Sequence, residues 1–240
     1  STNLKTKTSL VKLFGHECTR VFHDRLINDE DREWFMKCLE RTVKTHLKEN
    51  WTQTIANEDK NHVLLFGSFV DQTDSDNPEY KEMTCMNELR ESAVNFLQDY
   101  NAINKKKMDL VLFMNAIEHC ARISRVLNLP KGNALLVGVG GSGRRSLTRL
   151  AASISEYTVF EIEITKTYGV NEWKEDLIKM FRNAGEVDKP TVFLLSDTQI
   201  KEEIFVEHVN NILNVGEVPN LFDMETRNEI LENVTKDAAE

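Results

Sequence analysis

The chain has 240 residues, of which 40% are hydrophobic and 29% are charged, proportions typical of a globular protein that buries its own core. Its formal net charge of −9 argues against a nucleic-acid partner, because binding to a phosphate backbone requires a basic field. No apolar run approaches the roughly 20 residues that cross a bilayer, so we expect no membrane partner either.

Residues 1–51 have the apolar spacing of helices. Apolar side chains recur at helical intervals between Leu10 and Leu26, which predicts a first helix. Asn28 can cap a second helix, because three acidic residues follow it and suit the positive end of a helix dipole. From Trp34 to Val43 the apolar residues share one face of that helix. We therefore predict a small all-helical segment.

Residues 52–82 form a predicted connector, because the helical periodicity is lost there. Val63–Phe66 is a short apolar run. Asp71–Pro78 is acidic, polar and interrupted by proline, which indicates a surface loop.

Residues 83–240 begin with a helical pattern and continue with alternating strands and helices. Two helices are predicted first, over Asn87–Tyr100 and Met108–Leu127, and the sequence Leu129-Pro130-Lys131-Gly132 ends the second. Strands and helices then alternate, which predicts an α/β domain with a parallel sheet. The predicted strands are Ala134–Val137, Thr158–Ile164 and Val192–Leu195; the predicted helices are Ser146–Ser155, Asn171–Asn183 (capped by Asn171) and Lys201–Leu213.

Cysteine and histidine residues indicate neither a disulfide framework nor a zinc site. The four cysteines lie far apart, and none belongs to a CxxC motif or to a Cys/His cluster at zinc-ligand spacing. The histidines are equally scattered. We therefore expect reduced thiols, as in a cytosolic protein.

The sharpest motif is a glycine-rich loop between a predicted strand and a predicted helix. Glycines allow backbone N–H groups to turn inward around a phosphate, and the helix that follows presents its positive dipole end to the same anion. The loop therefore predicts a nucleotide-phosphate site. Its candidate residues are Gly138, Gly140, Gly141, Ser142, Gly143, Arg144, Arg145 and Ser146.

Two positions depart from the P-loop pattern GxxxxGK[ST]. Arg144 stands where lysine normally reaches the β- and γ-phosphates, so the charge is kept but the geometry differs. Arg145 stands where Ser or Thr normally binds Mg²⁺. Ser146 could supply that hydroxyl only if the register shifts by one residue.

The strand end at Ser196-Asp197-Thr198 is the candidate acidic motif of a nucleotide hydrolase. Such a strand normally ends in an aspartate that orients Mg²⁺ and a glutamate that activates water. Here Asp197 replaces either the glutamate or the aspartate, depending on the register, and only one carboxylate remains. Asp197 is thus the candidate catalytic and metal-side residue, and loss of the general base should slow hydrolysis by roughly 10²–10⁴-fold.

Three runs together resemble the fourth AAA+ module of dynein heavy chains: Gly132–Leu150, Phe193–Gln199 and Asn211–Phe222. Arginine in the phosphate loop and the Ser-Asp-Thr-Gln strand end look more like axonemal than cytoplasmic dyneins. Residues Leu10–Leu26 are similar to the small helical subdomain that closes the third module. The expected fold is an incomplete P-loop AAA+ parallel sheet with flanking helices, preceded by a small all-helical segment.

The resemblance implies a ring of six modules, in which the first is the main ATPase. It implies that the fourth module binds ATP or ADP, with or without Mg²⁺. It implies as partners the other modules of the ring, further dynein subunits, and microtubules reached through a stalk outside this chain. It also implies a place in the cytoplasm, the cytoskeleton and the axoneme of the cilium.

In this family the strand order is 5-1-4-3-2, and the sequence offers strands one, two and three without a convincing fourth. We therefore expect unpaired sheet edges. Two alternatives to a nucleotide-binding module stay open. One is a purely structural ring spacer that binds nothing. The other, an ordinary P-loop hydrolase or kinase, is disfavoured because the sequence shows no catalytic carboxylate pair.

Overall fold

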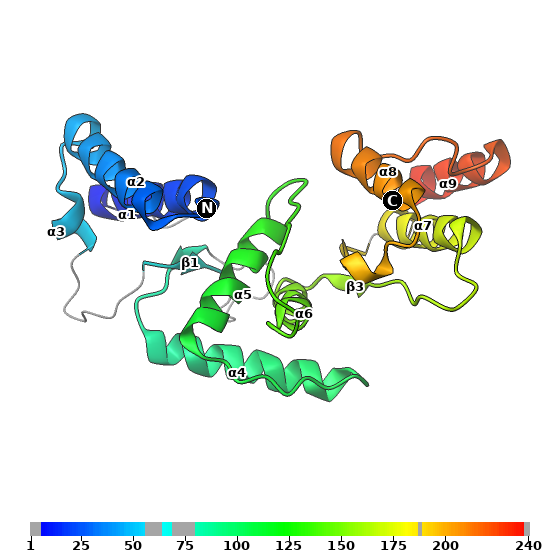
Figure 1. Cartoon of the computed structure of the whole chain (residues 1–240), viewed down its shortest axis with the longest axis horizontal. Helices are drawn as coiled ribbons and strands as arrows, with labels where there is room; N and C mark the ends of the chain where they lie inside the picture. Colours follow the sequence, from blue (N-terminus) through cyan, green and yellow to red (C-terminus); the bar gives the residue numbers. More distant parts are fainter. Residues whose placement is uncertain (1–5, 56–63, 69–79, 187–188, 238–240) are drawn as a thin grey trace. The chain divides into compact units, whose positions relative to one another are not determined.

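The structure, a computed structural model, describes residues 6–55, 64–68, 80–186 and 189–237. The chain divides into two units, Ser1–Arg125 and Val126–Glu240. Figure 1 shows the elements of the first unit in blue to green and those of the second in green to red. The division drawn from the sequence, at residues 51 and 82, stays a prediction. Among the described residues, no helix is long and apolar enough to span a membrane.

The first unit begins with the helical segment that the sequence predicts. Asn28 caps α2 as expected, since its Oδ1 accepts the N–H of Asp31 over 2.8 Å. A small core of Val11, Leu39, Val43 and Trp51 joins these helices. The elements are α1 (Lys7–Cys18), the π-helical turn η1 (Thr19–His23), α2 (Asp29–Thr42), a second π-helical turn η2 (Val43–Leu47) and α3 (Trp51–Ile55).

A short antiparallel hairpin and two helices complete the first unit. Strands β1 (Phe66–Gly67) and β2 (Lys81–Glu82) pair Phe66 with Glu82. Helix α4 (Met86–Ile103) confirms the predicted helix there, and α5 (Met114–Leu127) follows. The predicted surface loop at Asp71–Pro78 lies outside the described residues.

The helix predicted from Met108 starts six residues late. Residues 108–113 are not helical because the side chain of Asn101 holds the backbone of Met108 at both its N–H (2.7 Å) and its carbonyl (2.9 Å). Met108 and Leu112 are nevertheless buried. Their apolar pattern therefore reflects burial of a non-helical segment.

A polar cluster around Glu17 connects α1, the segment before β2, and α5. The Glu17 carboxylate accepts hydrogen bonds from the Tyr80 hydroxyl (2.9 Å) and from Arg125, and it lies 3.2 Å from Nδ1 of His16. His16 is buried, and its Nε2 accepts the N–H of Phe66. The cluster thus joins elements distant in sequence.

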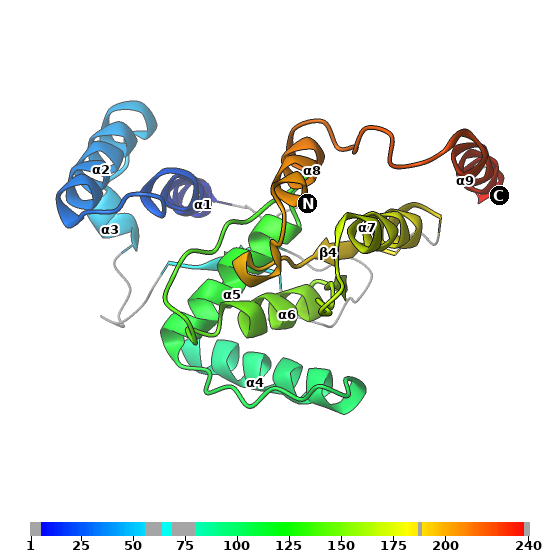
Figure 2. The ribbon, with the colours of Figure 1, turned by 45° about the vertical axis from the view of Figure 1, so that its right-hand side comes forward.

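The second unit is an α/β layer with a parallel strand pair, which confirms the predicted fold class. β3 pairs with β4 in parallel, Val159 opposite Val192. Helix α7 packs beside β4, as Figure 2 shows. The elements are α6 (Arg144–Ile154), β3 (Thr158–Phe160), α7 (Val170–Gly185), β4 (Thr191–Phe193), the 3-10 turn η3 (Asp197–Gln199), α8 (Glu203–Asn214) and α9 (Met224–Asp237).

The core of the second unit forms around Trp173. Its indole stacks on Phe205 with ring centroids 4.4 Å apart, and its N–H donates to Nδ1 of His208 over 3.0 Å. Leu177 and Ile162 are buried in the same cluster. This core fixes α7 and α8 against the strand pair.

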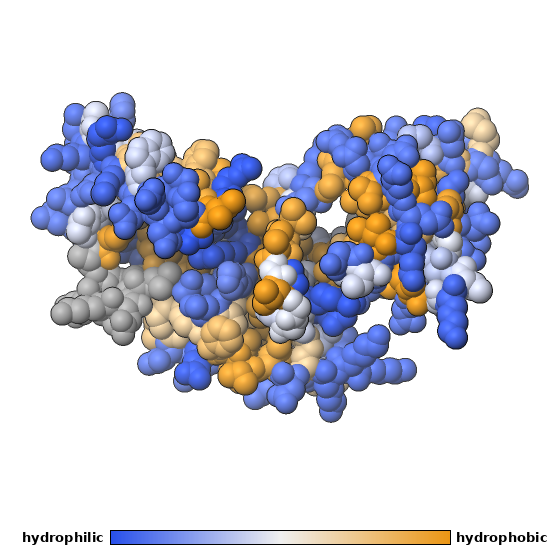
Figure 3. Space-filling model, in the orientation of Figure 1, coloured by the Kyte–Doolittle hydropathy of each residue, from blue (hydrophilic) through white to orange (hydrophobic). Residues whose placement is uncertain are grey.

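The predicted strand Ala134–Val137 is wrong as a paired strand. Among the described residues it has no ladder partner, and Leu135 and Val137 are 89% and 85% exposed. Figure 3 shows apolar side chains, in orange, at the surface along the segment that joins α5 to α6. The strand order that the resemblance implies has a fourth strand between this segment and β4. None of the described strands takes that place.

Other element boundaries also differ from the sequence prediction, including the start of α7 and the end of β3. Helix α7 is capped at Gly169 rather than Asn171, because the Glu172 carboxylate accepts the Gly169 N–H over 2.9 Å. β3 ends at Phe160 rather than at residue 164. Beyond it, the carbonyl of Ile162 accepts a hydrogen bond from the Gln199 side chain instead of from a strand.

Candidate functional site

The glycine-rich loop leads directly into α6. Gly141 and Gly143 have φ angles of 77° and 76°, in the left-handed region that L side chains rarely adopt. Added Cβ atoms at Gly140, Gly141 and Gly143 would meet nothing within 4 Å, so the loop presents open backbone. The loop therefore has the conformation for which its glycines are needed.

Helix α6 begins without a side-chain cap. Gly143 is its N-cap, and the Gly143 carbonyl accepts the N–H of Leu147 over 2.8 Å. The N–H groups of the first turn have no partner within the helix and lie at the positive end of its dipole. Buried Leu147 and Leu150 fix the helix in the unit. The first turn of α6 can thus bind an anion that the loop also contacts.

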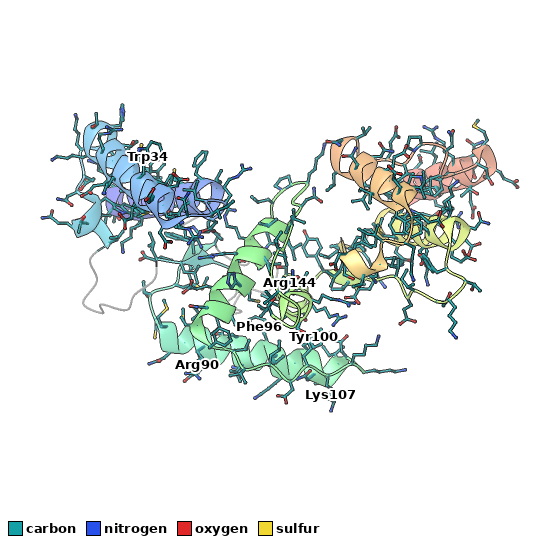
Figure 4. The ribbon with its side chains drawn as sticks, viewed as in Figure 1. Trp34, Arg90, Phe96, Tyr100, Lys107 and Arg144 are labelled. Carbon is teal, nitrogen blue, oxygen red and sulfur yellow. The ribbon has the colours of Figure 1, made fainter. Side chains whose placement is uncertain are left out.

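Arg144 folds back across the loop. Its guanidinium donates to the carbonyls of Leu136 (3.3 Å) and Val139 (3.1 Å). A Cβ added at Gly138 would lie 3.6 Å from the Cδ of Arg144. Figure 4 labels Arg144 at the start of α6. Because hydrogen bonds from a cation to an anion are stronger than those to a neutral carbonyl, a phosphate could displace these carbonyls.

Arg145 is paired with a carboxylate at the end of β3. Its Nη2 lies 3.2 Å from Oε2 of Glu161, which directly follows β3. Arg149, one turn later on the same face of α6, binds both oxygens of that carboxylate, at 2.9 and 2.7 Å. Burial opposes ionisation of Glu161, but these two arginines outweigh it and hold its pKa below the ordinary value. Arg145 is thus paired with an ionised carboxylate.

The acidic strand end is a closed turn. The Asp197 carboxylate accepts the N–H of Thr198 over 2.9 Å, and Asp197 is exposed. Among the described residues, no hydrogen bond or ion pair joins Asp197 to residues 138–146. The structure therefore keeps the loop residues together at the start of α6 but records no contact between them and Asp197.

Gln199 is a residue that the motif analysis missed. It is buried, its Oε1 accepts the N–H of Ser196 over 2.7 Å, and its Nε2 donates to the carbonyl of Ile162 over 2.7 Å. It joins the ends of the two strands and fixes the turn that carries Asp197. The spacing from Ser196 to Gln199 is that of a capping box, a signal that was present in the sequence.

The motif offers few oxygen ligands for a metal ion. Mg²⁺ prefers oxygen ligands in octahedral geometry. A guanidinium stands at the usual hydroxyl position, which leaves Ser146 on the first turn of α6 and the exposed Asp197. Among the described residues, no group of three or more His, Cys, Asp or Glu side chains could hold a metal ion.

A cavity of about 530 Å³ lies elsewhere in the second unit, between α7 and the residues that lead into α9. Of its lining residues, Arg182 is paired with Glu229, over 2.7 Å. It shares no residue with the phosphate loop and does not contribute to the candidate site.

Comparison with known proteins identifies similar sequences. Residues 108–240 match the family described as "P-loop containing dynein motor region D4". The chain is 43% identical over 228 residues to dynein axonemal heavy chain 1 of Homo sapiens, covering 95% of this chain and 5% of that protein. It is 43% identical over 230 residues to the dynein-1-beta heavy chain of the flagellar inner arm I1 complex of Chlamydomonas reinhardtii, with the same shares. The chain thus spans about one twentieth of these relatives.

Proposed function

The chain belongs to the family of P-loop-containing dynein motor region D4, an AAA+ module of dynein heavy chains, and on that premise we propose that it is a nucleotide-binding regulatory module. The glycine-rich loop and the first turn of α6 bind the phosphates of ATP or ADP. The binding residues are Gly138, Gly140, Gly141, Ser142, Gly143, Arg144, Arg145 and Ser146.

One observation carries this proposal. Gly141 and Gly143 have left-handed φ angles and leave the loop backbone open just before α6, which begins without a side-chain cap. The Arg144 guanidinium contacts the same loop. Backbone N–H groups, a helix dipole and a cation that converge on one place are the chemistry of phosphate recognition.

We further propose that hydrolysis at this site is slow. Asp197 is the one carboxylate of the acidic strand end, and it is turned to the backbone N–H of Thr198. Without a glutamate to activate water, the rate should fall by roughly 10²–10⁴-fold relative to a complete site. The module would then respond to bound nucleotide rather than consume it rapidly.

The names of the relatives suggest where the protein acts. The human relative is named as axonemal and the algal one as part of a flagellar inner arm. We propose that this chain works in the axoneme of a cilium, within the cytoskeleton. Its partners would be neighbouring modules of a heavy-chain ring, other dynein subunits, and microtubules through a part of the motor outside this chain.

A structural spacer is the second candidate function. It is favoured by one observation: the two arginines at the loop already have protein partners. Arg144 donates to Leu136 and Val139, and Arg145 is paired with Glu161. A spacer would keep these contacts permanently and bind no nucleotide.

Titration of the chain with a fluorescent ATP analogue separates the two candidates. Gly143→Val should abolish binding, because it strains a backbone at φ 76° and places a side chain at the helix start. Gly216→Val is the matched control, since Gly216 has a φ of 85° and equally open surroundings but lies at the end of α8. Saturable binding that Gly143→Val alone removes would support the regulatory module. Negligible binding by the unaltered chain would leave the spacer.

A further inference from the structure

The position of Arg145 determines what can neutralise a bound phosphate. In the P-loop pattern this position is Ser or Thr, whose hydroxyl binds Mg²⁺. Arg145 has no oxygen to offer, and its Nη2 lies 3.2 Å from the Glu161 carboxylate. The first turn of α6 therefore carries a fixed positive charge where a metal ligand would otherwise stand.

Glu161 fixes this charge in place. Its carboxylate is held through two hydrogen bonds by Arg149, and its side chain is only 18% exposed. Arg145 and Arg149 are four residues apart on one helix face, so a single carboxylate anchors both. This arrangement holds the Arg145 guanidinium at Glu161, next to the end of β3.

The charges near the loop add up to an anion site. Arg144 and Arg145 are the first two residues of α6, and both are cationic. They lie at the helix end that already attracts anions. A divalent cation placed there would be repelled by these guanidinium groups, whereas phosphate oxygens would be attracted. The remaining carboxylate, Asp197, is exposed and accepts the N–H of Thr198.

We propose that this site binds the phosphates of a nucleotide without a divalent cation, with Arg144 and Arg145 supplying the positive charge that Mg²⁺ supplies in a standard P-loop. The inference rests on the proposed nucleotide-binding function. It assigns to Arg145 a role that a standard P-loop gives to a metal-binding hydroxyl.

The test compares ADP binding to the chain in excess EDTA and in excess Mg²⁺, by isothermal titration calorimetry. We expect affinities that agree within about threefold. Arg145→Thr removes the charge and restores the hydroxyl of the P-loop pattern. It should lower the affinity in EDTA roughly tenfold, with recovery in Mg²⁺.

Arg227→Thr is the matched control, because it removes the same charge from an exposed position on α9 and should change neither affinity. Circular dichroism checks that each variant is folded. Binding that requires Mg²⁺ would overturn the inference and leave the proposed function intact. An Arg145→Thr variant that binds as the unaltered chain does in EDTA would overturn the role of Arg145. Absence of binding under both conditions would overturn the proposed function as well.

Discussion

The Trp51 indole leaves no room for a side chain at residue 15. A Cβ at Gly15 would overlap the Trp51 indole, which is buried in the core of the first unit. We expect Gly15→Ala to lower the free energy of unfolding by about 1–3 kcal/mol, because overpacking outweighs the helix propensity of alanine. Urea unfolding followed by circular dichroism measures this. Gly185→Ala, where a Cβ would meet nothing within 4 Å, should not destabilise, and an equal loss in both variants would contradict the steric argument.

The hydrogen bond between Trp173 and His208 connects stability to pH. Nδ1 of His208 accepts the indole N–H, so this nitrogen carries no proton in the folded state. Burial, aided by Lys174, lowers the pKa of His208 below 6.5. The unfolded chain therefore binds the proton more readily, and the free energy of unfolding should decrease as pH falls below 6.5.

His208→Asn tests that connection, because its amide oxygen can still accept a hydrogen bond but does not titrate. We expect the variant to lose part of the pH dependence below 6.5. His16 and His23, whose pKa values are also lowered by burial, would contribute the rest. Urea midpoints on either side of that pH measure the slope. An unchanged slope would show that His208 takes no part.

At the scale of elements, the Glu17 cluster joins α1 to α5 and to the segment before β2. Burial opposes ionisation of Glu17, but hydrogen bonds from His16, Arg125 and Tyr80 outweigh it and hold its pKa far below 4.5. A carboxyl group whose pKa is lowered by folding stabilises the fold at pH values above its pKa in the unfolded chain. This contribution should therefore be lost as pH falls below 4.5.

Glu17→Gln keeps the size of the side chain and removes its charge. We expect it to cost roughly 1–3 kcal/mol at neutral pH, since Arg125 loses its ionic partner, and much less below the pKa of an ordinary carboxylate. Urea unfolding at two pH values measures the difference. Glu33→Gln, an exposed position on α2, is the matched control. A cost that is the same at both pH values would contradict an ionic role for Glu17.

The segment before the phosphate loop is apolar in composition, but its exposure predicts that substitutions there have little effect on stability. Leu135→Lys should change the free energy of unfolding by less than about 0.5 kcal/mol, because Leu135 is 89% exposed. Leu150→Ala, at a fully buried position on α6, should cost about 2–5 kcal/mol. Denaturant titrations of both variants compare the two sites. A large loss from Leu135→Lys would mean that the segment is packed in solution.

Sequence reasoning succeeded where the cause is local. The N-cap at Asn28 and the helix after the glycine loop depend on neighbouring residues, and both are confirmed. It failed where the cause is distant. A strand at residues 134–137 needs a partner strand, and the extended run at Met108 depends on the side chain of Asn101. The P-loop motif alone also could not predict that Arg145 pairs with Glu161, because this pair depends on how α6 packs on β3.

At the scale of the whole molecule, the two units should respond differently to nucleotide. The proposed phosphate site lies entirely in Val126–Glu240, so ligand binding stabilises that unit by mass action. At about 100 times the Kd, the gain is roughly 2.7 kcal/mol. We expect amide hydrogen exchange to slow in α6 and its neighbours when ADP is added, with little change in α1 and α2. Gly143→Val should remove the protection, and Gly216→Val should keep it. Equal protection of both units would contradict this expectation and would mean that the ligand acts on more of the chain than the phosphate loop and the unit that carries it.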